Sequence, residues 1–223
     1  MAQRRQNSEL LPPELRNFDN MWFVDVVGPH VYFQTFLNVF RWDGSTLTVL
    51  AGVAGRTHAI HEMDGQPVFH RRGEGLFRLR DGWEDMVSKD SYFEENGTFF
   101  VLPFGDNGHL VGGPRTGLQH LVNGSVEPTT GSVSEYVREH DLYGGIALAD
   151  GRLAFATLAG GAVVMDRDGE IDLLLDEAAG VESLFVHGLF QDRDAGLWLL
   201  TRSGIYRADL GPYSVIDREH QLP

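Results

Sequence analysis

Arginine recurs at one kind of position in this sequence, shortly before a glycine that separates two short apolar segments. The arginines in this position are Arg71, Arg72, Arg115 and Arg202. A guanidinium group presents a planar fork of donors that binds a carboxylate, sulfate or phosphate bidentately. The chain has only 18 basic residues and a net charge of −14. Repeated placement of these few cations therefore predicts an anion-binding cluster.

Three further residues extend this candidate site. Arg56 and His58 lie on the segment that leads into the second of the repeats described below, and His187 lies near the start of the last one. The predicted ligand-binding set is therefore Arg56, His58, Arg71, Arg72, Arg115, His187 and Arg202. The alternative is that arginine at a hairpin turn is simply solvated, because isolated surface charges contribute little. Both interpretations stay open.

The other residues that could do chemistry are better explained by structure. His58 and His61 would point to opposite faces of a strand, so they do not form a chelating pair. Aspartates that lie beside turn glycines are explained by turn formation. They occur once per repeat and so are too far apart to bind calcium together. These residues are Asp64, Asp106, Asp150 and Asp194. Nucleophile motifs, phosphate loops and paired carboxylates are also missing. We therefore predict no metal site, no cofactor and no catalytic residue.

The elements that position the arginines form an internal repeat. The turn residue that precedes the third strand of each copy recurs every 37 to 44 residues, at Asn38, Gly75, Gly117, Gly161 and Gly204. Two further sets of turns repeat in step with it, many of them Asp-Gly or Asn-Gly, the strongest hairpin signals. Three turns in each unit of about 43 residues give four antiparallel strands, a pattern typical of propeller blades.

The sequence thus predicts an all-β fold, a β-propeller of four-stranded antiparallel blades. After a lead-in over residues 1–20, the propeller spans residues 21–223. Its five blades are expected at residues 21–52, 54–96, 97–140, 141–183 and 184–223. Helices are expected only at residues 8–16 and at Ser132–Glu139, with insertions between blades at residues 84–96 and 131–140.

Composition excludes several classes of partner. The excess of 32 acidic over 18 basic residues repels phosphate backbones and anionic membranes, so nucleic acid is not expected as a partner. The absence of cysteine excludes disulfides and thiolate metal sites. No apolar run approaches the roughly 20 residues of a transmembrane helix, and the N-terminus lacks the apolar segment of a secretory signal. Membrane contact by this segment is therefore not expected.

Residues 184–209 carry a resemblance to a known family. The matching positions are Leu189, Asp192, Gly196, Leu197, Trp198, Thr201, Gly204, Ile205 and Arg207. This stretch resembles the two-component regulator propeller repeat, which occurs in sensor regions of hybrid histidine kinases and related signalling proteins. Leu200 and Gln221 stand where the family has glycine. The match is strongest in the fifth blade and weakens toward the N-terminus.

The resemblance implies a non-catalytic, ligand-sensing module of a signalling receptor. Members usually carry seven-bladed rings outside the membrane, followed by a membrane helix and a kinase, cyclase or DNA-binding region. This chain would then be part of a larger sensor, partnered by further blades or an output domain, and it would self-associate as a fragment. A closed five-bladed ring is the alternative. The expected location is extracytoplasmic (periplasmic) for a receptor and cytoplasmic for a protein that stands alone.

Two other functions remain open at this point. One is a propeller enzyme, lactonase- or lyase-like, that acts on a small polar substrate through groups such as Glu62 or His187. The other is a protein–protein scaffold, a common role of propellers. Fold alone does not decide among them.

Overall fold

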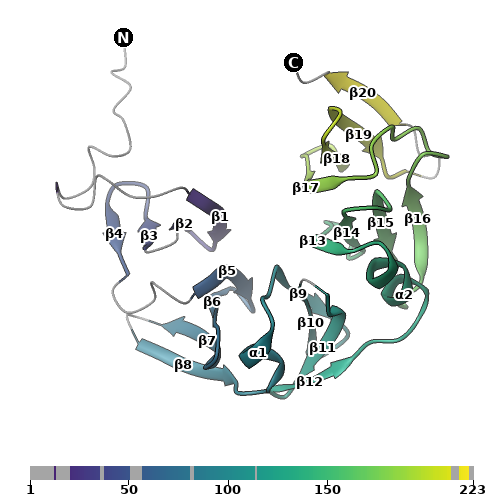
Figure 1. Cartoon of the computed structure of the whole chain (residues 1–223). Coiled ribbons are helices and arrows are strands. Elements are labelled where there is room, and N and C mark those ends of the chain that lie inside the picture. The colour runs from purple at the N-terminus through teal and green to yellow at the C-terminus, as the bar shows by residue number, and fades with distance from the viewer. Residues whose placement is uncertain are drawn as a thin grey trace, which may run out of the picture. The chain divides into compact units, whose positions relative to one another are not determined.

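The chain is built almost entirely from β-strands, as the computed structural model in Figure 1 shows. The structure describes residues 13, 21–35, 38–50, 57–80, 83–113, 115–211 and 216–220; several side chains, including those of residues 57–59 and 216–220, are outside the description. The strands form five four-stranded antiparallel sheets in which sheet order follows chain order. These sheets are the five blades of a β-propeller, the fold that the repeat predicts.

The strands of each blade and the two helices follow one another in a regular order. Blade one holds β1 (Met21–Val27), β2 (His30–Thr35), β3 (Val39–Trp42) and β4 (Leu47–Val49). Blade two holds β5 (Thr57–Met63), β6 (Gln66–Arg71), β7 (Gly75–Arg80) and β8 (Trp83–Ser88), followed by α1 (Tyr92–Glu95). Blade three holds β9 (Phe100–Phe104), β10 (Gly108–Gly113), β11 (Gly117–Val122) and β12 (Ser125–Pro128), followed by α2 (Ser132–Glu139). Blade four holds β13 (Leu142–Ala147), β14 (Leu153–Thr157), β15 (Ala162–Met165) and β16 (Ile171–Leu175). Blade five holds β17 (Val186–Gln191), β18 (Gly196–Thr201), β19 (Ile205–Asp209) and β20 (Ile216–His220).

The chain divides into two compact units, with the boundary between Glu95 and Asn96. The first unit contains blades one and two with α1, and the second contains blades three to five with α2. Neither α1 nor α2 is long and apolar enough to cross a membrane, and the described residues contain no other helix that is.

One insertion differs from the prediction. Residues 84–96 were expected to form an insertion, but Trp83–Ser88 is the fourth strand of blade two, paired with β7. The charged pair Glu84 and Asp85 is compatible with this strand because it lies at the edge of its sheet, where charged side chains reach water. The helix over Ser132–Glu139 has the predicted bounds. The predicted helix at residues 8–16 lies outside the described residues except for residue 13.

Apolar residues of neighbouring blades bury one another. Every residue of β14 is buried, and its side chains alternate between two core clusters. Leu153 and Phe155 pack with blade three and α2. Ala154 and Ala156 pack with blade five. Burying a side chain the size of phenylalanine contributes about 1.5–3 kcal/mol, so a blade is stable only between its neighbours.

Blades one and two of the first unit pack in the same way. Val27 and Tyr32 of blade one share a cluster with Ile60, Phe69 and Phe77 of blade two. Nε2 of the buried His70 ring in blade two lies 2.7 Å from the carbonyl oxygen of Phe93 in α1.

The turn between the second and third strands is closed by a threonine hydroxyl in three blades. Thr201 Oγ1 donates to the carbonyl oxygen of Gly204 at 2.9 Å, and Thr157 Oγ1 donates to that of Gly161 at 2.9 Å. Thr35 Oγ1 donates to Asn38 at 3.3 Å in blade one. In blade four the turn glycine has φ of +77°, and a Cβ there would collide with the carbonyl oxygen of Leu175. Blade four therefore needs glycine at this point for both backbone angle and space.

Asp192 organises the opposite turn of blade five, between β17 and β18. Its carboxylate accepts hydrogen bonds from Trp198 Nε1 at 2.7 Å, Arg207 Nε at 2.9 Å and the backbone N–H of Gly196 at 2.9 Å. Gly196 leaves room for the Arg207 guanidinium, which a Cβ would displace. These hydrogen bonds, with that of Arg207 the strongest, hold the pKa of Asp192 well below its ordinary value of 3.8.

We expect Gly161→Ala to lower the free energy of unfolding by about 3 kcal/mol or more, because backbone strain and collision with Leu175 add together. Gly180→Ala is the matched control, since Gly180 has φ of +94° but no atom within 4 Å of a Cβ. This variant should lower the free energy of unfolding by only about 1–2 kcal/mol. Urea unfolding of both variants checks this, and equal losses would contradict the role assigned to Gly161.

We also expect Asp192→Asn to unfold more readily than the wild-type protein at pH 7. The folded-state pKa of Asp192 is lowered, so its ionised form stabilises the fold above the unfolded-state pKa. That contribution should decline below about pH 5 and disappear as the pH falls through the folded-state pKa. Thermal unfolding of both proteins between pH 3 and pH 7 measures the difference.

The control for this prediction is Asp194→Asn in the same turn. The Asp194 carboxylate accepts no hydrogen bond in the described structure. Its substitution should therefore leave the pH dependence of thermal unfolding near that of the wild type. If the two variants have the same profile, the Asp192 carboxylate does not stabilise the turn.

Candidate functional site

The β18–β19 turn and the segment that leads into β17 lie together at one end of blade five. The Arg202 guanidinium in the turn lies over the ring of Phe185, which immediately precedes β17, at 4.5 Å from its centroid. In blade four, the backbone N–H of Gly161 donates to the carbonyl oxygen of Leu184 at 2.9 Å. Turns between second and third strands thus share an end with the links between blades, as the sequence predicts.

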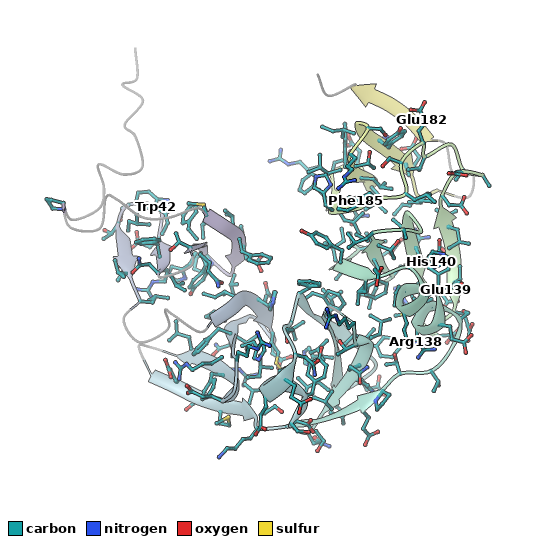
Figure 2. All side chains as sticks on the ribbon, viewed as in Figure 1. Trp42, Arg138, Glu139, His140, Glu182 and Phe185 are labelled. Atoms are coloured by element: carbon teal, nitrogen blue, oxygen red, sulfur yellow. The ribbon has the colours of Figure 1, made fainter. Side chains whose placement is uncertain are left out.

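An aromatic row crosses this end of the second unit; we use this name for Phe99, Tyr143 and Phe185. Their ring centroids lie 5.5 Å apart for the first pair and 6.4 Å apart for the second. The row follows β9, β13 and β17, the first strands of blades three, four and five, which lie side by side (Figure 1). Phe185 is labelled in Figure 2 at the start of β17. His187 extends the row, its ring 5.9 Å from that of Phe185.

The polar groups beside the row are accessible. Tyr143 is 40% exposed, and Arg202 and His187 are also exposed. Within the described structure, the side chains of these three residues make no hydrogen bond. A guanidinium stacked on a ring keeps the donors at its edge available, so Arg202 can bind an anion while it rests on Phe185. The arrangement suits a ligand that has an anionic group and a flat apolar body.

Arg71 of the first unit occupies a different environment. Its guanidinium is paired with Glu84 at 2.8 Å and with Glu74 at 3.2 Å. It also lies over the rings of Phe69 and Phe77, at 5.3 and 4.8 Å from their centroids. Partial burial alone would lower the pKa of Arg71, but the two carboxylates raise it above its ordinary value. An anionic ligand would have to compete with both carboxylates for this side chain.

The remaining candidates are spread over the structure. Arg72 is exposed and donates to the carbonyl oxygen of Glu95 at 3.5 Å. Arg115 is exposed in the β10–β11 turn with φ of +71°, and no hydrogen bond or ring contact joins it to the aromatic row. Arg56 lies outside the described residues, and His58 lies in β5 with its side chain outside them. Of the seven candidates, the row brings together His187 and Arg202.

The turn aspartates have other partners. Asp64 pairs with Arg78 at 3.2 Å, and Asp150 pairs with Arg152 at 2.7 Å. These bonds stabilise hairpins inside single blades. The part of the chain that the structure describes contains no group of three or more histidines or carboxylates that could hold a metal ion.

The sequence interpretation missed the three aromatic residues of the row. Phe99, Tyr143 and Phe185 are 44 and 42 residues apart, which is the period of the blades. Each stands at or next to the start of a first strand. A search for aromatic residues in phase with the turn glycines would have found them.

Comparison with known proteins supports the fold. No family model matches the sequence, and no curated protein matches it. Among solved structures, the chain is similar to the extracellular domain of BT3049, assigned to a hybrid two-component system of B. thetaiotaomicron, with a TM-score of 0.70 at 11% identity. The alignment covers 93% of this chain and 29% of that domain. The chain therefore spans less than a third of the length of this neighbour.

Two other neighbours are proteins of other kinds. Virginiamycin B lyase from Staphylococcus aureus aligns with a TM-score of 0.64 at 13% identity, covering 95% of this chain and 72% of the lyase. The WD40 propeller domain of Doa1 aligns with a TM-score of 0.66 at 12% identity, covering 92% of this chain and 71% of the domain. At these identities the likeness establishes the propeller fold alone, and the neighbours that share it include a two-component system protein, a lyase and a WD40 protein.

Proposed function

We propose that this chain is a non-catalytic, ligand-sensing β-propeller module of a two-component-type receptor. Its ligand is a small molecule that carries an anionic group on a flat apolar body, and it binds on the aromatic row. The observation that carries the proposal is the exposed Arg202, stacked on Phe185 beside the accessible Tyr143 and His187.

The chemistry of the row supports binding in preference to catalysis. Arg202 supplies charge and bidentate geometry, and the rings supply apolar faces. Tyr143, His187 and Arg202 make no hydrogen bonds to one another, so no group in the row is held as a base against a nucleophile. Such a set of separate donors around an apolar surface is typical of recognition sites.

The receptor setting rests on two likenesses, one in sequence and one in structure. The repeat in blade five resembles that of two-component regulator propellers, and the extracellular domain of the hybrid two-component system BT3049 has a similar fold. By this analogy the module lies outside the cytoplasm, and its partners are further blades or an output domain. Binding across blades three, four and five would favour one arrangement of those blades and thereby pass a signal onward.

We expect Arg202→Gln to weaken the binding of 4-fluorobenzoate, a probe with an aromatic body and one carboxylate, by about tenfold. The variant removes a charge-assisted hydrogen bond and the stacked cation. A titration followed by fluorine NMR measures the affinity.

Arg193→Gln is the matched control because Arg193 is an exposed arginine of the same blade, in the turn between β17 and β18. It should bind the probe like the wild type. If both variants bind alike, or if the wild type does not bind 4-fluorobenzoate, the aromatic row is not an anion site of this kind.

A further inference from the structure

A cavity of about 290 Å³ lies between blade three, α2 and blade four. It shares no residue with the aromatic row and lies within the second unit. Its apolar lining comes from Phe104, Leu110, Leu118 and Met165. The volume is near the lower end of the range of small-molecule sites, about 300–1,000 Å³. Arg138 and Glu139 at the C-terminal end of α2, and His140 directly after it, are labelled in Figure 2 and locate this helix.

The charged groups around the cavity are all carboxylates. Glu127 on β12 and Asp168 in the β15–β16 turn are exposed, and each comes from a different blade. Neither carboxylate has an ion pair or hydrogen bond in the described structure. Glu170 is already engaged, because it accepts a hydrogen bond from Ser132 Oγ at 2.6 Å at the start of α2. The cavity therefore combines an apolar part and several polar groups with three negative charges, two of which belong to carboxylates without a hydrogen-bond partner.

The ring of His120 forms part of the wall and departs from the pattern of blades two and five. Arg78 and Arg207 occupy its place in the third strands of blades two and five, and each pairs with an aspartate. His120 instead packs edge-to-face on Phe104 at 5.6 Å and makes no hydrogen bond through either ring nitrogen, of which Nε2 is buried. The arginine–aspartate pair of blades two and five is thus absent from blade three, where the cavity occurs.

We propose that this cavity is a second ligand site, specific for a small amine with an apolar body. The ammonium group lies between Glu127 and Asp168, and the apolar body contacts Phe104, Leu118 and Met165. The lining contains no lysine or arginine, so the site rejects anions of the same shape. Its ligand has the opposite charge to that of the aromatic row, and the proposal does not depend on the row.

Methionine methyl groups provide a direct test, because Met165 is one of only five methionines and lines the cavity. The full chain, labelled with ¹³C at the methionine methyls, is titrated with 2-phenylethylamine. We expect a saturable shift of the Met165 signal, assigned with Met165→Leu. The signal of Met86, which is exposed in the first unit, should not move. A Met165 signal unaffected by the amine would overturn the proposal.

Charge specificity is tested with analogues and surface variants. Phenylacetate, which carries the opposite charge, should produce no shift of Met165. Glu127→Gln and Asp168→Asn should each weaken amine binding about fivefold. This factor corresponds to the upper end of the free energies measured for partly exposed ion pairs. Glu177→Gln, an exposed carboxylate outside the cavity, should bind as the wild type does. Equal binding of phenylacetate, or unchanged affinity in both cavity variants, would overturn the proposed recognition of an amine.

Discussion

The turn between the second and third strands of each blade is the constraint on which the candidate chemistry depends. It must reverse the chain within a few residues, and a threonine hydroxyl closes it onto the following carbonyl in blades one, four and five. In blade four the N–H of the turn glycine also bonds to the link that leads into blade five. The turn of blade four is therefore fixed by its own blade and by the link to the next one. In blade five, the turn that Thr201 closes places Arg202 over Phe185, and no ion pair of Arg202 itself is present in the described structure.

Residues that match the repeat serve the scaffold, and the proposed sites use residues between them. Asp192, Trp198 and Arg207 form one hydrogen-bonded cluster, while Thr201 closes a turn. Their types are fixed by geometry whatever the module binds. Function can therefore change at a position such as Arg202, whose exposed side chain makes no hydrogen bond in the described structure.

The sequence predicts the blades well because its information is local. Turn glycines with positive φ recur with the period of the blades, and Gly161 and Gly204 stand where the third strands begin. The helix over Ser132–Glu139 is equally local. Contacts between segments that are distant in sequence were not predictable in this way. Arg71 illustrates the difference. Its partner Glu84 lies on β8, a segment that the sequence assigned to an insertion. The ion pair that neutralises Arg71 could therefore not be foreseen.

The candidate site was only partly predictable for the same reason. The position of Arg202 in a turn follows from the repeat, but its contact with Phe185 depends on how β17 packs beside β13. The cavity depends still more on tertiary packing, since α2 and the β15–β16 turn border it together. Sequence spacing gives the register of side chains along a strand. It does not give the space left between two sheets.

Both proposed sites cross boundaries between blades, and this has a thermodynamic consequence. The core between blades three and four includes Leu110, Phe155 and Met165, and two of these residues also line the cavity. A ligand in the cavity contacts both blades, so it stabilises the arrangement in which they are packed. The aromatic row crosses the same boundary between Phe99 and Tyr143. If packing at this boundary differs between two states of the module, each ligand must alter the affinity for the other by the same factor. An amine and an anion would then act on one shared boundary without touching each other.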